Sequence, residues 1–496
     1  MTKKIHILGI SPCSLETGKK DLLTLFADKK NRIDTVFARK EDADLLARVR
    51  GYINSENKSI TVENDGNITH LNNATIFYDS KIKFIIDYIK GNLGKKNVLI
   101  IANGDPNYFG IGGAILNKLK EGEKRFVEIY PAVSFMQIGF SKLKIPMTEA
   151  VIVSLHGRDL KNIYPALYSR GKNIGIYTDN VNTPGKIHSK LEEKGFLEYF
   201  NFYVLTDLCT KSEKIHKSLT KELLEDLGNK KNIIILSEKN TKNFEDGVIG
   251  IDDDKYIHVT GEPTKKEVRV ISIGLLGLKA DSIVVDAGCG SGSVSMEVSA
   301  IARNGIVYAV DKNISKIENL KKNIKKFWRP NIEPILGELP DSFKTLKDIC
   351  STQIDSVFIG GGGSDLIDIL TGSLDILKDK GVIVINSITI NSLNSVLSFI
   401  NNFNNFDLKN DKNNNFEIRY EIISVNVARL KSIKKDSYFQ ALNQIYITKI
   451  IKMLKPDKLN KSNKFKSNIK QTVYKMEENK PNVKVRNKAI KPKDTE

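Results

Sequence analysis

The sequence predicts an α/β protein with more than one domain. Its 496 residues exceed the usual size of a single domain. Short apolar runs rich in β-forming residues alternate with segments of helical periodicity, a pattern typical of largely parallel sheets. Two glycine-rich loops, "ANGDPNYFGIGG" at 102–113 and "DAGCGSGS" at 286–293, directly follow apolar runs. Loops of this kind after a strand commonly bind a nucleotide or a similar ligand.

Shifts in composition indicate the domain boundaries. Residues 238–257 are polar and contain an acidic cluster, so we expect a linker there between an N-terminal domain, 1–237, and a C-terminal domain, 258–450. The C-terminal domain has five apolar runs separated by helical stretches. Two later runs, "YEIISVNVARL" and "NQIYITKI", are expected to form an antiparallel pair at the sheet edge. Residues 451–496 have few apolar residues and no periodicity, which predicts a basic disordered tail.

The charge is unevenly distributed along the chain. There are 77 Lys and Arg residues against 59 Asp and Glu residues, a formal net charge of +18. Residues 452–496 hold 14 of the basic residues and 5 of the acidic ones, which gives this segment a net charge of +9. Because half of the excess lies in the expected tail, we do not expect a nucleic-acid partner.

The lengths of the apolar runs and the spacing of the four cysteines bear on cellular location and on disulfide or metal chemistry. No apolar run reaches the roughly 18–20 residues of a membrane helix, and no signal peptide follows Lys3 and Lys4. We therefore expect a cytoplasmic protein that does not associate with a membrane. The cysteines lack CxxC spacing and indicate neither a disulfide framework nor a metal site. They are Cys13, Cys209, Cys289 and Cys350.

The second glycine loop is the stronger ligand signal. Asp286 ends a predicted strand, and Gly288, Gly290 and Gly292 follow it. A dinucleotide fingerprint requires its third glycine at position 293, which is Ser293 here, so an NAD-binding oxidoreductase is disfavoured. Asp311 ends the next predicted strand, where an acidic side chain can accept hydrogen bonds from both hydroxyls of a ribose. The first loop fits neither the P-loop nor the dinucleotide pattern.

These features together resemble the class I methyltransferases that use S-adenosylmethionine (SAM). The flanking stretches "GEPTKKEVRVISIGLLGL", "VFIGGGGSDLIDIL" and "VNVARLKSI" narrow the resemblance to the C-terminal half of the decarboxylating precorrin-6Y C5,15-methyltransferases, over 258–450. Two departures from that family are Gln444, where proline is usual, and the "GGGG" run. The resemblance implies a Rossmann-like domain that binds SAM. The implied binding residues are Thr264, Asp286, Gly288, Cys289, Gly290, Ser291, Gly292, Asp311, Glu338 and Leu339.

Residues 1–237 resemble the tetrapyrrole (corrin/porphyrin) methylases. The matching stretches are "ILGISPC", "ANGDPNYFGIGG", "YPAVSFMQIGFSKLKIP", "VSLHGRD" and "TDNVNTPGKI". The resemblance implies a two-lobed α/β fold with a second SAM site that includes Gly104 and Asp105. An alternative role for Asp105 is to cap its own turn. In the first stretch Ser11 and Cys13 replace the usual glycines, so this turn departs from the family pattern.

The family resemblance implies a bifunctional enzyme of cobalamin biosynthesis. It would methylate C5 and C15 of precorrin-6Y and remove the carboxylate of the ring C acetate. Candidate residues on the side of this polycarboxylate tetrapyrrole are His156, Arg158, Lys265, Glu267 and Arg269, and no general acid, catalytic nucleophile or metal is identified. Alternatives are that only the C-terminal domain is active, or that the protein methylates RNA. We also expect a homo-oligomer.

Overall fold

The computed structural model describes most of the chain from residue 3 to residue 455. Within that range it leaves out residues 12, 14–19, 23, 26–31, 56–67, 72–73, 170–171, 240–243, 246, 259–262, 351–353, 362, 409–415 and 435. The predicted disordered tail lies outside the described residues from 456 onward. The chain divides into two compact units, Met1–Asn243 and Phe244–Glu496. This division falls inside the predicted linker, and the described residues from 244 onward belong to the C-terminal unit.

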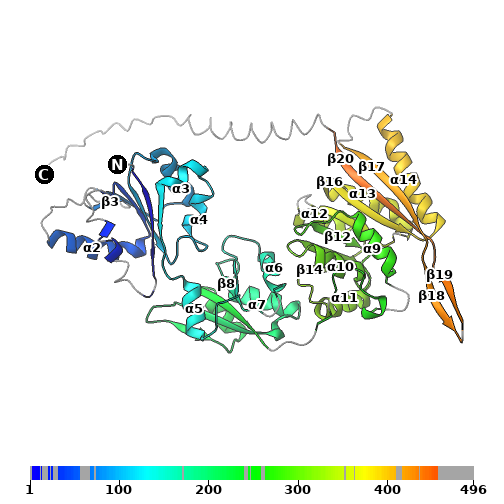
Figure 1. Ribbon diagram of the computed structural model, residues 1–496, viewed down its shortest axis with the longest axis horizontal. Helices are drawn as coiled ribbons and strands as arrows, with labels where there is room; N and C mark the ends of the chain where they lie inside the picture. Colours follow the sequence, from blue (N-terminus) through cyan, green and yellow to red (C-terminus); the bar gives the residue numbers. More distant parts are fainter. Residues whose placement is uncertain are drawn as a thin grey trace, which may run out of the picture. The chain divides into compact units, whose positions relative to one another are not determined.

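The first lobe of the N-terminal unit is a six-stranded sheet (Figure 1). The strands have the order β3-β4-β2-β5-β1-β6, and all pairs are parallel except β3 with β4. The strands are β1 (Ile5–Ile10), β2 (Thr35–Ala38), β3 (Ile68–Leu71), β4 (Ala74–Tyr78), β5 (Val98–Asn103) and β6 (Val127–Tyr130). The α-helices of this lobe with both ends in the described residues include α2 (Ala43–Ser55), α3 (Ile82–Asn92) and α4 (Ile111–Leu116). β1 and β5 are buried along nearly their whole length, which explains their continuous apolar sequences.

The second lobe contains a five-stranded sheet of order β10-β9-β11-β8-β7. Only β7 and β8 pair in parallel, so the expectation of largely parallel sheets is wrong for this lobe. β8 and β9 each pair antiparallel with β11, and β9 also pairs antiparallel with β10. The strands are β7 (Val151–Ser154), β8 (Ile174–Tyr177), β9 (Phe200–Thr206), β10 (Lys214–His216) and β11 (Asn232–Glu238). The helices are α5 (Phe135–Leu143), α6 (Tyr164–Leu167), α7 (Pro184–Glu193) and α8 (Lys221–Leu227).

The loops after β1 and β9 are joined by a disulfide between Cys13 and Cys209. The two Cα atoms lie 4.9 Å apart, although 196 residues separate them in the sequence. The prediction that the cysteines form no disulfide is therefore wrong for this pair. Local spacing could not reveal the bond because tertiary structure alone brings the two lobes together at this point. Cys289 and Cys350 are free thiols.

The C-terminal unit is built on one seven-stranded sheet of order β14-β13-β12-β15-β16-β20-β17. The first five strands in this order are parallel, and β20 pairs antiparallel with both β16 and β17. The strands are β12 (Ile283–Ala287), β13 (Ile306–Asp311), β14 (Ile332–Leu336), β15 (Ile354–Ile359), β16 (Leu377–Ser387), β17 (Phe416–Val425) and β20 (Ile445–Leu454). The predicted antiparallel pair is present.

Helices accompany the parallel strands of this sheet (Figure 1). They are α9 (Lys266–Leu275), α10 (Ser293–Ile301), α11 (Ile314–Lys326), α12 (Ser342–Cys350), α13 (Leu366–Ile376) and α14 (Ile390–Leu408). The side chain of Asn313 accepts hydrogen bonds from the backbone N–H groups of Ser315 and Lys316, which fixes the start of α11 directly after β13. A large apolar core packs between the sheet and α12, α13 and α14. The site loops therefore extend from a rigid base.

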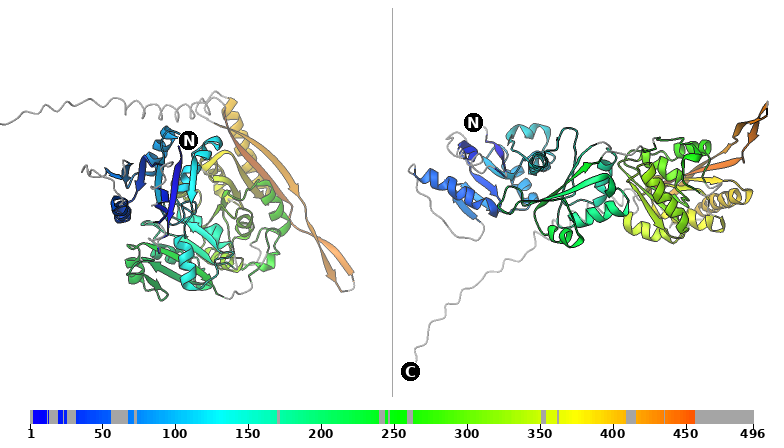
Figure 2. Two further views of the ribbon diagram at one scale, coloured as in Figure 1. Left: turned by 60° about the vertical axis from the view of Figure 1, so that its left-hand side comes forward. Right: turned by 90° about the horizontal axis from the view of Figure 1, so that it is seen from below.

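A two-stranded hairpin, β18 (Ala428–Ile433) and β19 (Asp436–Ala441), projects from the sheet between β17 and β20 (Figure 2). The sequence predicted one continuous run here, but the chain leaves the sheet at Val425 and enters the hairpin at Ala428. In the part of the chain that the structure describes, no helix has the length and apolarity to cross a membrane.

The disulfide should stabilise the N-terminal unit in a way that depends on reductant. Because it closes a loop of 196 residues, its loss should lower the free energy of unfolding of this unit by about 2–5 kcal/mol. In calorimetry, the unfolding transition of the N-terminal unit should shift to lower temperature when dithiothreitol is added. Cys13→Ser should remove that shift, whereas Cys350→Ser should retain it. A wild-type transition that is insensitive to reductant would contradict the bond.

Candidate functional site

A cavity of about 680 Å³ opens at the carboxyl ends of β12, β13 and β14 in the C-terminal unit. This size lies within the usual range for small-molecule sites. Of the ten residues predicted to bind a cofactor here, nine line the cavity. They are Thr264, Asp286, Gly288, Cys289, Gly290, Ser291, Asp311, Glu338 and Leu339. Their roles in binding stay a prediction, but the structure brings them together.

The glycine loop between β12 and α10 is held by hydrogen bonds to β13. The N–H groups of Gly288 and Cys289 both donate to the carbonyl oxygen of Val310, at 2.9 Å. The N–H of Gly290 donates to Oδ2 of Asp311, also at 2.9 Å. Gly292, the tenth predicted residue, is absent from the cavity lining. It has a φ of +87°, and a Cβ there would collide with the side chain of Leu320, so its role is to start α10.

Asp286 is a buried carboxyl group at the cavity floor, with 1% of its surface exposed. Its Oδ2 accepts a hydrogen bond from the Ser295 hydroxyl, while its Oδ1 is buried without a partner. Burial raises the pKa of Asp286 to about 7, against the opposing effect of the Ser295 hydrogen bond. This side chain can therefore exist as a neutral acid near neutral pH and donate a proton in a hydrogen bond.

Asp311 ends β13 and Glu338 lies two residues after the end of the neighbouring strand β14, and both line the cavity. Asp311 is 8% exposed, and its Oδ1 accepts from the N–H of Asn313 at 2.9 Å. Since each carboxylate oxygen can accept a second hydrogen bond, Asp311 keeps acceptor capacity toward the cavity. Glu338 is exposed and pairs with Lys312 at 2.9 Å.

Two of the three substrate-side candidates before β12 are held in ion pairs. Arg269 is fully buried and bonds to Glu297, so it does not lie at the cavity mouth, where the sequence placed it. Glu267 pairs with Arg429 at 2.6 Å. The third candidate, Lys265, precedes α9 and is half-buried. None of the three is among the residues that line the cavity.

A second cavity, of about 810 Å³, lies between the two lobes of the N-terminal unit. Its lining includes Arg39 and Asn103 from the first lobe, and His156, Asp179 and Lys231 from the second. Lys231 bridges the lobes by an ion pair of 2.6 Å to Glu41. A hydrogen bond from the N–H of Asn182, with two more from nearby backbone groups, lowers the pKa of Asp179. The lining of the cleft therefore contains both positively charged side chains, such as Lys231, and negatively charged ones, such as Asp179.

The predicted residues of this unit are only partly brought together. His156 lines the cleft, whereas Arg158, two residues later, is exposed outside it. Gly104 and Asp105 follow β5 but are not among the described lining residues. Oδ1 of Asp105 accepts from the N–H of Asn107 at 2.8 Å, the turn-capping geometry that was the alternative interpretation. Gly9 packs tightly on this loop, since a Cβ there would lie 2.7 Å from the Gly104 oxygen.

Several lining residues were not predicted from the sequence. In the C-terminal unit these include Lys312, Lys316, Phe358 and Asp365, and in the N-terminal unit Arg39, Tyr177, Asp179 and Lys231. Lys312 and Arg39 directly follow β13 and β2, and Asp179 stands two residues after β8, so a search for charged side chains at strand ends could also have selected them. The others have no comparable signal. Among the described residues, no group of three or more His, Cys, Asp or Glu side chains is placed to hold a metal ion.

Two family models match separate parts of the chain. Residues 17–224 match the tetrapyrrole (corrin/porphyrin) methylases, and residues 255–406 match the precorrin methyltransferase domain. A "probable cobalt-precorrin-6B C(15)-methyltransferase (decarboxylating)" of Saccharolobus solfataricus is 32% identical over 186 residues, which cover 37% of this chain and 85% of that protein.

The chain belongs to the precorrin methyltransferase family.

Two further similar proteins are a relative that covers a larger part of this chain and a protein with a solved structure. The "precorrin-6Y C(5,15)-methyltransferase [decarboxylating]" of a Sinorhizobium species is 26% identical over 294 residues, which cover 59% of this chain and 68% of that protein. A crystal structure of the precorrin-6y C5,15-methyltransferase from Geobacter metallireducens is 32% identical, with a TM-score of 0.36, and covers 41% of this chain and 96% of that one.

The buried acid of this precorrin methyltransferase should make its stability depend on pH. Because the pKa of Asp286 is higher in the folded state than in the unfolded chain, its contribution to stability is full below about pH 4 and is lost as pH rises through about 7. Relative to Asp286→Asn, the wild type should therefore lose roughly 2–3 kcal/mol of unfolding free energy between pH 5 and pH 8.

Denaturant titrations followed by the fluorescence of Trp328 can measure this difference. Trp328 is the single tryptophan of the chain and lies buried in the C-terminal unit. The Asp286→Asn variant serves as the control for all other titrating groups, which both proteins share. A difference in unfolding free energy that is the same at both pH values would show that Asp286 is ionised in the folded state.

Proposed function

We propose that the protein is a bifunctional SAM-dependent enzyme of cobalamin biosynthesis that acts on precorrin-6Y. The C-terminal unit would methylate C15 and remove the carboxylate of the ring C acetate, and the N-terminal unit would methylate C5. The observation that carries this proposal is the presence, in one chain, of two different methylase family matches, each on a unit with its own cavity. The name of the Sinorhizobium relative specifies methylation at C5 and C15 and also decarboxylation.

The groups that line the C-terminal cavity suit SAM. Asp311 can accept from ribose hydroxyls, the glycine loop allows close approach to the amino acid part, and Leu339 offers an apolar surface to adenine. The unpartnered Oδ1 of Asp286 is a further polar atom at the cavity floor. In the N-terminal unit, the cleft between the lobes would hold the second SAM, although Gly104 and Asp105 are not among its described lining residues.

Methyl transfer places modest chemical demands on the protein. SAM supplies a methyl group already activated by its sulfonium charge. The residues of the chain must align donor and acceptor carbon in line and exclude water, so no side-chain nucleophile is needed. The acceptor carbons would be meso positions of the reduced tetrapyrrole, made electron-rich by the ring nitrogens.

Decarboxylation would use the macrocycle of the substrate as its electron sink. The bond between the acetate carbon and its carboxylate breaks, CO2 leaves, and a proton then reaches the remaining carbon. The other carboxylates of the tetrapyrrole substrate would be bound by basic groups near the mouths of the cavities. Lys312 and Lys316 are candidates in the C-terminal unit, and Arg39 and Lys231 in the N-terminal unit, because Lys and Arg pair well with carboxylates. A cytoplasmic location and a homo-oligomer remain predictions from the sequence.

The proposed function is tested by mass spectrometry of the product formed by the full chain from precorrin-6Y and SAM. We expect a product that has gained two methyl groups and lost one CO2. Gain of one methyl with loss of CO2 would mean that the N-terminal unit is inactive, which the altered "GISPC" turn makes a specific alternative. A product with neither change, from protein that binds SAM, would contradict the proposal.

A further inference from the structure

The segment that leads into α9 forms one wall of the C-terminal cavity. Pro263 and Thr264 of this segment line the cavity, and residues 250–258 precede them along the surface of α10 and α11. We call residues 250–258 and 263–265 the strap. It contains only a short 3-10 helix, Asp253–Lys255, so its position depends on side chains from the neighbouring helices.

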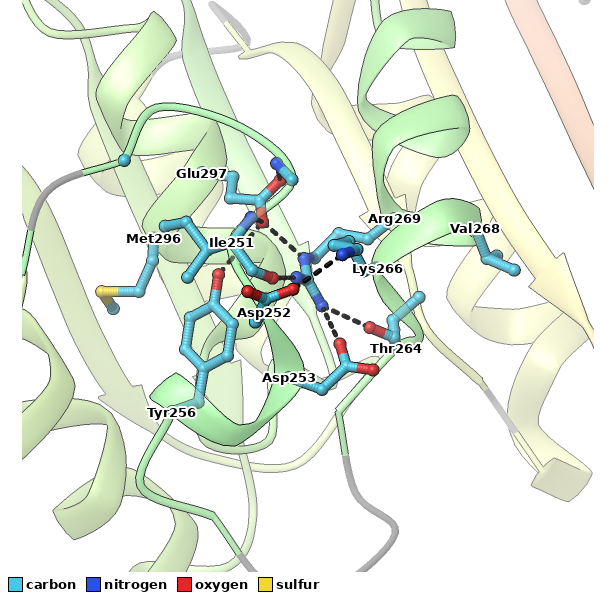
Figure 3. Close-up of polar contacts among 12 residues, drawn as sticks. Ile251, Asp252, Asp253, Tyr256, Thr264, Lys266, Val268, Arg269, Met296 and Glu297 are labelled. Carbon is cyan, nitrogen blue, oxygen red and sulfur yellow. Dashed lines mark hydrogen bonds and ion pairs between the residues drawn. The ribbon is translucent and has the colours of Figure 1, made fainter. Parts of the chain in front are cut away.

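Arg269 of α9 binds the strap at both ends (Figure 3). Its Nη1 donates to the carbonyl oxygen of Thr264 at 2.5 Å and to Oδ1 of Asp253 at 3.1 Å. Its Nη2 donates to the carbonyl oxygen of Ile251. The guanidinium group also lies over the ring of Tyr256, 5.0 Å from its centroid. One fully buried side chain therefore sets the separation between the start of the strap and the cavity wall.

Glu297 of α10 completes this arrangement. Its carboxylate accepts four hydrogen bonds, from Nε of Arg269 at 2.7 Å, the hydroxyl of Tyr256 at 3.1 Å, and the N–H groups of Gly250 and Ile251 at 2.9 and 3.0 Å. Glu297 is fully buried, like Arg269. A buried carboxylate is costly unless its lone pairs are satisfied, and here each oxygen has partners.

The arrangement extends to the glycine loop and to the hairpin. Asn323 of α11 bonds to both backbone groups of Ile257, and its amide also donates to the carbonyl oxygen of Ser291 at 2.9 Å. Arg429, at the base of β18, donates to Glu267 at 2.6 Å and to Asp253 at 3.2 Å. The strap is therefore fixed to three helices, and Asn323 links it to the glycine loop of the cavity.

We propose that Arg269 and Glu297 are positioning residues of the C-terminal SAM site, which hold the Thr264 wall at the distance from the glycine loop that SAM requires. This role rests on the proposed function. It replaces the sequence-based interpretation of Arg269 as a substrate contact. Lysine cannot substitute, because a single ammonium group cannot reach Thr264, Asp253, Ile251 and Glu297 together. Methyl transfer is sensitive to such placement, since a shift of about 1 Å can cost about 100-fold in rate.

The test compares Arg269→Lys with Arg329→Lys in the full chain. Arg329 is a matched control, because it is also buried and donates to backbone oxygens, those of Met296, Phe327 and Gly247, none of which lines the cavity. Three quantities are measured for each variant. They are the thermal stability of the C-terminal unit, the Kd for SAM at the site that Asp311→Ala weakens, and the KM and kcat for SAM-dependent CO2 release.

We expect both variants to lower the thermal stability of the C-terminal unit. Only Arg269→Lys should raise Kd and KM for SAM, by about tenfold or more, and it should lower kcat as well. Arg329→Lys should leave Kd within about twofold of wild type. Glu297→Gln, which preserves size, should follow Arg269→Lys and replaces it if that variant does not fold.

A Kd for SAM within about twofold of wild type in folded Arg269→Lys or Glu297→Gln would overturn the proposal. It would also be overturned if Arg329→Lys raised Kd as much as Arg269→Lys, because the effect would then follow stability alone. Wild-type protein that binds SAM but releases no CO2 from precorrin-6Y would contradict the proposed function only. The binding constants alone would still decide the positioning role.

Discussion

The parallel pairing of β12 with β13 is the constraint on which the C-terminal site depends. It places Ala287 opposite Val310, so the loop after β12 and the acid that ends β13 reach the same edge of the sheet. The N–H groups of Gly288, Cys289 and Gly290 can then bond to Val310 and Asp311. Because two main-chain hydrogen bonds to Val310 and one to the buried Asp311 carboxylate hold this loop, a ligand would meet a loop that is already shaped.

The N-terminal unit reaches a cavity by a different route. Its cleft lies between two sheets of different topology, and it is crossed by the ion pair between Lys231 and Glu41. Such an exposed pair contributes little to stability. The disulfide between Cys13 and Cys209 is a covalent connection of the same two lobes in addition to the main chain between β6 and α5. Cys13 lies in the turn that departs from the methylase pattern. The residue that replaces a usual glycine in this turn is therefore the one that forms the disulfide.

The sequence allowed the lining of the C-terminal cavity to be predicted better than the lining of the N-terminal one. Asp286, Asp311 and the glycines follow a spacing that strand and loop geometry imposes, so local sequence was sufficient. Burial of Arg269 was not predictable in this way, because a charged residue at a helix start faces water or the interior depending on distant partners such as Glu297. For the same reason the sequence could not show that His156 lines the cleft whereas Arg158, two residues later, does not. The pairing of Cys13 with Cys209 required the arrangement of two lobes.

The central claim is that each unit holds its own SAM. The most direct test is the stoichiometry of SAM binding to the full chain, measured by equilibrium dialysis with labelled ligand. We predict two molecules bound per chain. Asp311→Ala should weaken one of them by about 1–3 kcal/mol and leave the other unchanged, because it removes acceptors for the ribose hydroxyls in one unit only. The exposed Asp341→Ala should change neither. Binding of a single molecule that Asp311→Ala does not affect would contradict the account.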